Sequence, residues 1–76
     1  MNNLRRGLLD KALKALDDAE EYVNSVLDEE QDCLSNIPES FEGTDRYNKM
    51  ESAIDSLESA LDSISDARSQ IDSASE

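Results

Sequence analysis

The chain has 76 residues, one cysteine, no histidine and a net charge of −12. A chain of this length forms one domain at most, and a single cysteine excludes an internal disulfide. The composition also lacks the usual ligands of a structural zinc ion, and so acidic a body repels nucleic-acid phosphate and anionic membranes.

A seven-residue repeat occupies the first half of the chain from Leu9 onward. Its first position carries leucine or valine until Glu30, its fourth carries mainly small residues, and its fifth includes Leu27 and Leu34. Apolar residues three and four apart are typical of a helix that packs along its length against other helices. The repeat predicts a helix over about residues 4–35.

The segment 36–44 separates the two repeats and contains the only proline. Pro38 cannot lie inside a helix without losing a hydrogen bond, and Gly43 is a second helix breaker. Thr44 is a good N-cap for a following helix. We expect one extra helical turn that starts at Pro38 and brings Phe41 to close the end of the hairpin.

Four unbroken heptads fill the second half of the chain from Met50. Alanine occupies the fourth position of each heptad, at residues 53, 60, 67 and 74, and large aliphatic residues occupy the first. The pattern predicts a second helix over about residues 45–73. Arg68 replaces an aliphatic residue, and we expect it at a bundle end or beside an acid of a partner chain.

The two repeats predict an all-α fold, a single antiparallel two-helix hairpin with coiled-coil-like packing and an alanine-rich seam. The apolar stripe is three positions wide, so each helix is expected to touch at least two others. Domains this small have marginal stability unless a disulfide, a metal ion or oligomerisation stabilises them, and oligomerisation is the possibility that remains. We therefore expect a four-helix bundle or a higher homo-oligomer. The predicted packing seam consists of Leu9, Ala12, Leu16, Ala19, Val23, Val26, Ala53, Leu57, Ala60, Ile64, Ala67 and Ile71.

Cys33 shares the seam position of the small residues, which favours a buried thiol in a reducing compartment. An intermolecular disulfide or a reactive thiol is the alternative. Asp10 and Lys11 interrupt the first apolar residues, so no signal peptide is expected, and no stretch predicts a membrane span. We expect the protein in the cytoplasm.

The sequence contains none of the patterns that accompany catalysis. Histidine, a Gly-rich phosphate loop and metal-ligand spacing are all missing. Paired carboxylates such as Asp17 and Glu21 are ordinary solvated acids of an exposed helix. We expect no catalytic residue, no metal and no cofactor, and we predict that the chain is not an enzyme.

The connection is the best candidate for a binding site, because the free N–H groups at the start of the second helix can hold an anion. Arg46 adds a bidentate donor, Tyr47 a stacking ring and Lys49 a second cation. The predicted ligand-binding residues are Asn36, Ser40, Thr44, Arg46, Tyr47 and Lys49. The alternative is that both cations pair with Asp32 or neighbouring acids, while Tyr47 packs on Leu34.

The charge is distributed unevenly along the chain. Residues 1–14 hold four bases against one acid, whereas residues 15–76 hold three bases against 18 acids. Direct binding to nucleic acid or to a membrane is therefore not expected. The acidic outer faces either keep the protein in solution or imitate the phosphate backbone of DNA and occupy a basic groove of a partner.

The segment Asn36–Phe41 and the acidic heptads that follow it resemble a group of small acidic helical-hairpin proteins of phages, prophages and their Gram-positive hosts. The resemblance covers most of the chain, and the Asn-Leu/Ile-Pro-Glu motif at residues 36–39 is its specific part. It implies a phage-encoded binder in the host cytosol that blocks or sequesters a host component, with defence systems as frequent targets. No functional residue carries over from this group.

Three functions follow from these observations. The first is an oligomeric binding protein, encoded by a phage, that antagonises host defence by sequestering a small nucleotide-like signal near the connection. Its partners are then further copies of itself and either that ligand or a host protein. The second is an acidic DNA mimic that inhibits a nucleic-acid-binding protein, and the third is a purely structural or adaptor hairpin.

Overall fold

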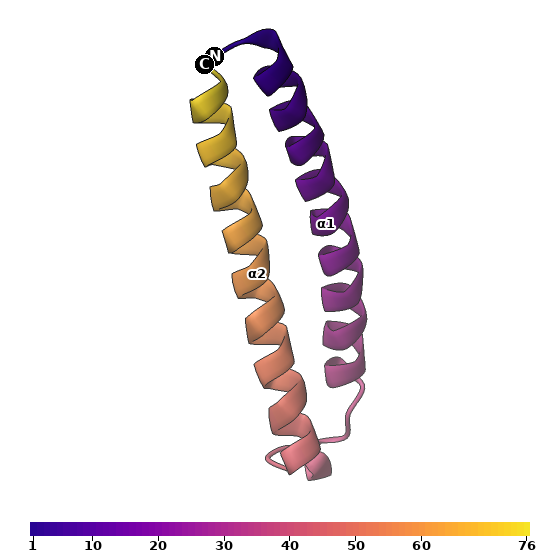
Figure 1. The fold of residues 1–76 in the computed structure, drawn as a ribbon. Helices are drawn as coiled ribbons and strands as arrows, with labels where there is room; N and C mark the ends of the chain where they lie inside the picture. The colour runs from indigo at the N-terminus through magenta and orange to yellow at the C-terminus, as the bar shows by residue number, and fades with distance from the viewer.

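A computed structural model describes all 76 residues and contains two long helices that pack side by side in opposite directions. Helix α1 spans Asn3–Ser35 and helix α2 spans Asp45–Ser75, with a short 3-10 helix, η1, at Glu39–Phe41 between them. Both chain ends lie at one end of the hairpin, and the connection lies at the other (Figure 1). The prediction of an all-helical chain with two packed helices is confirmed, and both long helices end within two residues of the expected ranges.

Side chains cap both long helices at their N-termini. The Asn2 side-chain oxygen accepts a hydrogen bond from the Arg5 backbone N–H at 2.8 Å, and the Thr44 hydroxyl accepts one from the Tyr47 N–H at 3.3 Å. Each cap satisfies an N–H group that the first turn of a helix leaves without a partner. The cap at Thr44 fixes where the connection ends and α2 begins.

The connection follows the breakers in the sequence. Pro38 has extended backbone, with φ −60° and ψ 147°, so it precedes η1 and is not its first helical residue as we expected. Gly43 has a φ of 82°, a left-handed conformation that residues with a Cβ rarely adopt. Phe41 is 55% exposed, so it does not close the end of the hairpin.

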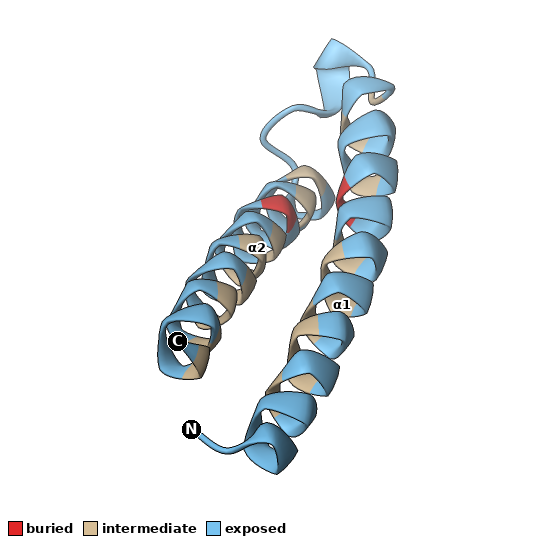
Figure 2. Ribbon diagram, turned by 90° about the horizontal axis from the view of Figure 1, so that it is seen from above, coloured by how far each residue is buried: buried red, intermediate tan, exposed pale blue.

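The core of the hairpin is small. Leu27 of α1 and Ile54 of α2 are the only buried residues, each 7% exposed. Each lies in the half of its helix nearer the connection, and the segments coloured as buried are on the facing sides of the two helices (Figure 2). Two helices form a single layer that encloses little volume, so the rest of the seam stays partly exposed.

The apolar seam between the helices uses the first and fifth heptad positions of α1. Leucine at the fifth position buries more apolar area than alanine at the fourth, which favours this choice. Of the twelve residues predicted for the packing seam, ten are partly buried, whereas Val26 and Ala53 are exposed. The large apolar residues of the observed seam are Leu9, Leu13, Leu16, Val23, Leu27 and Leu34 of α1, and Tyr47, Met50, Ile54, Leu57, Leu61, Ile64 and Ile71 of α2.

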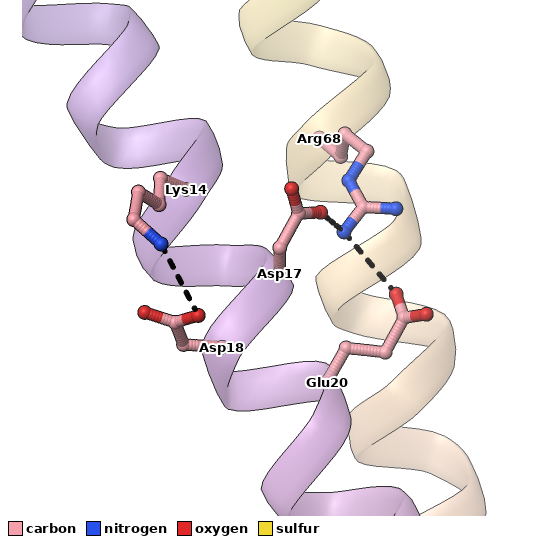
Figure 3. Close-up of polar contacts among 5 residues, drawn as sticks. All are labelled: Lys14, Asp17, Asp18, Glu20 and Arg68. Atoms are coloured by element: carbon pink, nitrogen blue, oxygen red, sulfur yellow. Dashed lines mark hydrogen bonds and ion pairs between the residues drawn. The ribbon is translucent and has the colours of Figure 1, made fainter.

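Arg68 forms its ion pairs within its own chain, whereas we expected it at a bundle end or beside an acid of a partner chain. Its guanidinium forms ion pairs with Asp17 and with Glu20, the latter at 3.3 Å (Figure 3). Glu20 also occupies a seam position. The charged residue that interrupts the apolar repeat of α1 therefore contacts Arg68, which interrupts the apolar repeat of α2. Because all three side chains remain partly exposed, each pair stabilises the fold by about 0–1 kcal/mol at most.

The alanine residues flank the row of large seam residues, and four of them, Ala12, Ala19, Ala60 and Ala67, are themselves partly buried. Each directly precedes a seam position, and in antiparallel helices such positions point to the same side of the hairpin. We call this side the alanine face. Its residues at the fourth heptad position are Ala12, Ala19, Val26, Cys33, Ala53, Ala60 and Ala67, and Leu8, Ala15 and Tyr22 lie at its edge.

The opposite side of the hairpin is acidic. Residues that directly follow seam positions point to this side, and the carboxylates among them are all exposed. We call this side the acidic face. Its carboxylate residues are Asp10, Asp17, Glu21, Asp28, Glu51, Asp55, Glu58, Asp62 and Asp72. The hairpin therefore presents two sides of different chemistry.

Candidate functional site

The connection and the first turn of α2 surround a hollow of about 450 Å³. This volume is within the range of small-molecule sites, about 300–1,000 Å³. The hollow has apolar walls with polar groups among them. Its lining residues are Asn36, Ile37, Pro38, Phe41, Thr44, Arg46 and Tyr47.

Hydrogen bonds hold the backbone around this hollow in one conformation. The Phe41 N–H donates to the Pro38 carbonyl at 2.9 Å, and the Thr44 hydroxyl donates to the Phe41 carbonyl at 2.9 Å. The backbone N–H groups of Asp45 and Arg46 have no acceptor within the chain. Two donors of the α2 N-terminus thus remain free, and the helix dipole favours negative charge near them.

Four of the six predicted ligand-binding residues line the hollow: Asn36, Thr44, Arg46 and Tyr47. Ser40 does not line it, and Lys49 lines a separate groove. The prediction missed Ile37, Pro38 and Phe41 as lining residues. Their apolar side chains next to the polar ones in the connection were the available signal, since small-molecule sites are mostly apolar.

The cations near the connection form no ion pairs, contrary to the alternative that they are neutralised by Asp32 or its neighbours. The ion pairs of the chain involve only Lys14 and Arg68 as cations. Arg46 is the only charged residue that lines the hollow, and no carboxylate lines it. A planar guanidinium without a partner is well suited to a bidentate contact with phosphate or carboxylate.

Lys49 and Arg46 also line an open groove of about 540 Å³ beside the hollow. Two carboxylates, Glu30 and Asp45, share this groove, together with Met50 and Ala53. Glu30 is partly buried at a seam position, where the repeat of α1 changes from aliphatic to acidic. The mixed charge of this groove makes it less suited to an anion than the hollow.

Partial burial raises the pKa of Tyr47 above its ordinary value of 10.0, and the carboxylates of Glu51 and Glu42 raise it further. We expect Glu51→Gln to lower the pKa of Tyr47 towards 10, measured by phenolate absorbance with Tyr22→Phe as the background. Glu58→Gln, two turns along α2, is the matched control and should leave the titration unchanged. Equal effects of the two substitutions would contradict the role of Glu51.

The raised pKa also sets the direction of a pH effect on stability. The folded state favours the neutral phenol, so this contribution is complete below the unfolded pKa of about 10. It is lost as the pH rises through the higher folded pKa. Alkaline pH should therefore weaken the connection end of the hairpin.

Cys33 is exposed, which corrects the expectation of a buried thiol. It occupies the fourth heptad position of α1, which lies outside the hairpin seam. No group of three or more potential metal ligands comes together in the structure. No helix combines the length and the apolar character needed to cross a membrane.

No protein-family model, curated protein or solved structure matches the chain.

Proposed function

We propose that the chain is a non-enzymatic, homo-oligomeric binding protein that sequesters a small nucleotide-like ligand at the connection. The supporting observation is the hollow whose only charged lining residue is Arg46, a guanidinium without an ion pair. In this proposal Arg46 and the free N–H groups of α2 bind a phosphate. Tyr47 and Phe41 supply rings on which a base can stack.

The biological role that we propose follows from the resemblance at residues 36–39. A phage-encoded protein of this kind acts in the host cytosol and antagonises host defence by removing a nucleotide signal from its receptor. A sequestering protein needs no catalytic group, only an affinity that competes with the receptor. The lining of the hollow includes the Arg46 guanidinium and two aromatic side chains, Phe41 and Tyr47, which suits a ligand that carries both a phosphate and a base.

Titration calorimetry with cyclic dinucleotides and with ADP-ribose tests this proposal. We expect heat of binding with at least one of these probes, and weaker binding as the salt concentration rises, because phosphate contacts are screened. The helical content of the sample should be checked by circular dichroism. Absence of heat with every probe, from a folded sample, would reject the proposal.

The acidic face supports a second function, inhibition of a nucleic-acid-binding protein by imitation of DNA. Its exposed carboxylates follow both helices along the length of the hairpin, and no basic residue other than Lys14 and Arg68 is paired with an acid. Rows of negative charge attract the basic groove of such a partner. A purely structural or adaptor hairpin would need neither the hollow nor this face.

Reversing the charge of Asp55, Glu58 and Asp62 together distinguishes the second function. We expect the triple lysine variant to lose competition with duplex DNA for a DNA-binding protein, if the acidic face is the inhibitor. Ser52→Lys combined with Ser59→Lys is the control, because it adds lysines to α2 on the side away from the seam and outside the acidic face. Full inhibition by the triple variant would reject DNA mimicry.

A further inference from the structure

The hairpin exposes more surface than a compact chain of its mass. Its accessible area is 5688 Å², whereas a compact monomer of 8.4 kDa exposes about 4,600 Å². The excess of about 1,100 Å² is comparable with the about 800 Å² that each partner buries in a stable protein–protein interface. Covering one side of the hairpin would remove an excess of this size.

The alanine face is the side suited to being covered. Val26 is 49% exposed on this face, and Leu8, at its edge, is 56% exposed. Alanine side chains allow helices of two hairpins to approach closely. The acidic face would repel a second copy of itself, so a second copy cannot be placed there.

We propose that a second copy of the chain packs on the alanine face, with the two-fold axis parallel to the helices. Helix α1 of each copy then lies against α2 of the other, and both connections lie at the same end of a four-helix bundle. This inference rests on the homo-oligomer in the proposed function and goes beyond it by naming the face and the arrangement. It does not depend on the ligand.

The size of the residues on the face selects this arrangement. The α1 side contributes larger residues, Leu8, Tyr22 and Val26, whereas the α2 side contributes only alanine between its polar residues. Glu30 of α1 lines one groove with Met50 and Ala53 of α2, so Val26, one turn from Glu30, lies within about one helical turn of the level of the partner's Ala53 when the connections lie at the same end. Connections at opposite ends would place α1 against α1 through these larger residues and α2 against α2 through alanine, so the two pairs of helices would require different interaxial distances.

Charge at the edges of the face selects the same arrangement. Lys49 of α2 and Glu29 of α1 lie at the two outer edges of the alanine face, near the connection, and neither forms an ion pair within its hairpin. With both connections at one end, Lys49 and the partner's Glu29 are offset along the bundle axis by less than about one helical turn, 5.4 Å, so their side chains can meet across the interface. The two-fold axis repeats this contact, so each dimer has two such pairs.

Ala53→Glu tests the face, because Ala53 is exposed in the single hairpin and glutamate there leaves the hairpin itself intact. Ser52→Glu is the matched control, one residue away and pointing away from the face. By sedimentation equilibrium we expect twice the chain mass for the wild type and for Ser52→Glu, and the chain mass of 8.4 kDa for Ala53→Glu. Circular dichroism on the same samples reports helical content.

The measurement is made at about 100 µM, a concentration roughly 100-fold above a micromolar Kd. A wild-type protein that is helical but monomeric at this concentration would overturn both the proposed homo-oligomer and the proposed interface on the alanine face. An oligomer whose mass Ala53→Glu leaves unchanged would overturn the face alone. A larger assembly that Ala53→Glu reduces to single chains supports the face. Calorimetry with nucleotides on the same samples reports the ligand proposal separately.

A charge-reversal cycle tests the arrangement. We expect Glu29→Lys and Lys49→Glu each to weaken dimerisation about tenfold, and the double variant to regain the wild-type Kd. The two residues lie at opposite edges of one hairpin, so recovery requires contact between copies. A double variant that is weaker than either single variant would overturn the arrangement.

Discussion

Leu27→Ala is expected to lower the free energy of unfolding by about 2–3 kcal/mol, towards the lower end of the range for leucine-to-alanine changes in protein cores. Leu27 is one of only two buried residues, so its loss removes a large part of the apolar area that the seam buries. The effect stays near the lower end because the seam is open on both sides and its neighbours can move inwards. Urea denaturation at one protein concentration measures it.

Leu4→Ala is the matched control for this prediction. It makes the same change in the same helix, but Leu4 is 74% exposed, so we expect a loss below about 0.5 kcal/mol. Equal losses for the two variants would show that the seam near the connection is not the core of the fold. A similar loss for Ile54→Ala would support the pairing of the two buried residues.

Arg46→Ala is expected to weaken binding of a phosphate-containing ligand by about 10- to 150-fold, the equivalent of the 1.5–3 kcal/mol that a hydrogen bond to a charged group contributes. The substitution breaks no ion pair within the chain, because Arg46 forms none. Alanine also favours helix as well as arginine does, so α2 should be unaffected. Titration calorimetry with the best nucleotide probe measures the change.

Lys14→Ala controls for the loss of one positive charge. Lys14 pairs with Asp18 at 3.7 Å on the exposed surface of α1, away from the connection. We expect its removal to change the Kd of the nucleotide less than about twofold, by a long-range effect alone. If both variants weaken binding equally, the ligand responds to net charge and the hollow is not its site.

The helix boundaries could be predicted from the sequence because single residues determine them. Pro38 cannot continue α1, Gly43 supplies the left-handed turn, and Thr44 caps α2. Each acts through its own backbone geometry, so no knowledge of the partner helix is needed. The same local rules predicted an extra turn near Phe41, which the structure has as η1.

The positions of the largest buried side chains within the apolar stripe could not be predicted in the same way. The apolar stripe of α1 is three positions wide, and its fourth and fifth positions both lie beside the first. Leu13 and Leu27 favour the fifth position, but Glu20 interrupts the apolar residues there. Arg68 interrupts the apolar repeat of α2 in the same way, and the sequence alone does not show that these two residues pair. Once Arg68 and Glu20 are seen to pair, both interruptions become part of one contact (Figure 3).

For the candidate site, local sequence predicts the residues in the first turn of α2 but not the full lining of the hollow. Arg46 and Tyr47 are recognisable from their place in the first turn of α2, and they do meet at one hollow. The path of the connection decides which other residues join them. That path carries Phe41 to the hollow and leaves Ser40 outside it, a result of the turn conformation at η1 that residue types alone do not specify.

The rod shape of the hairpin has a consequence for its behaviour in solution scattering. The hairpin measures 59 × 15 × 13 Å and has a radius of gyration of 17.3 Å, compared with about 11 Å for a globular chain of equal length. A second hairpin stacked along its side adds width but almost no length. Forward scattering would therefore double while the radius of gyration barely changes, whereas an end-to-end pair would double the forward scattering and nearly double the radius as well.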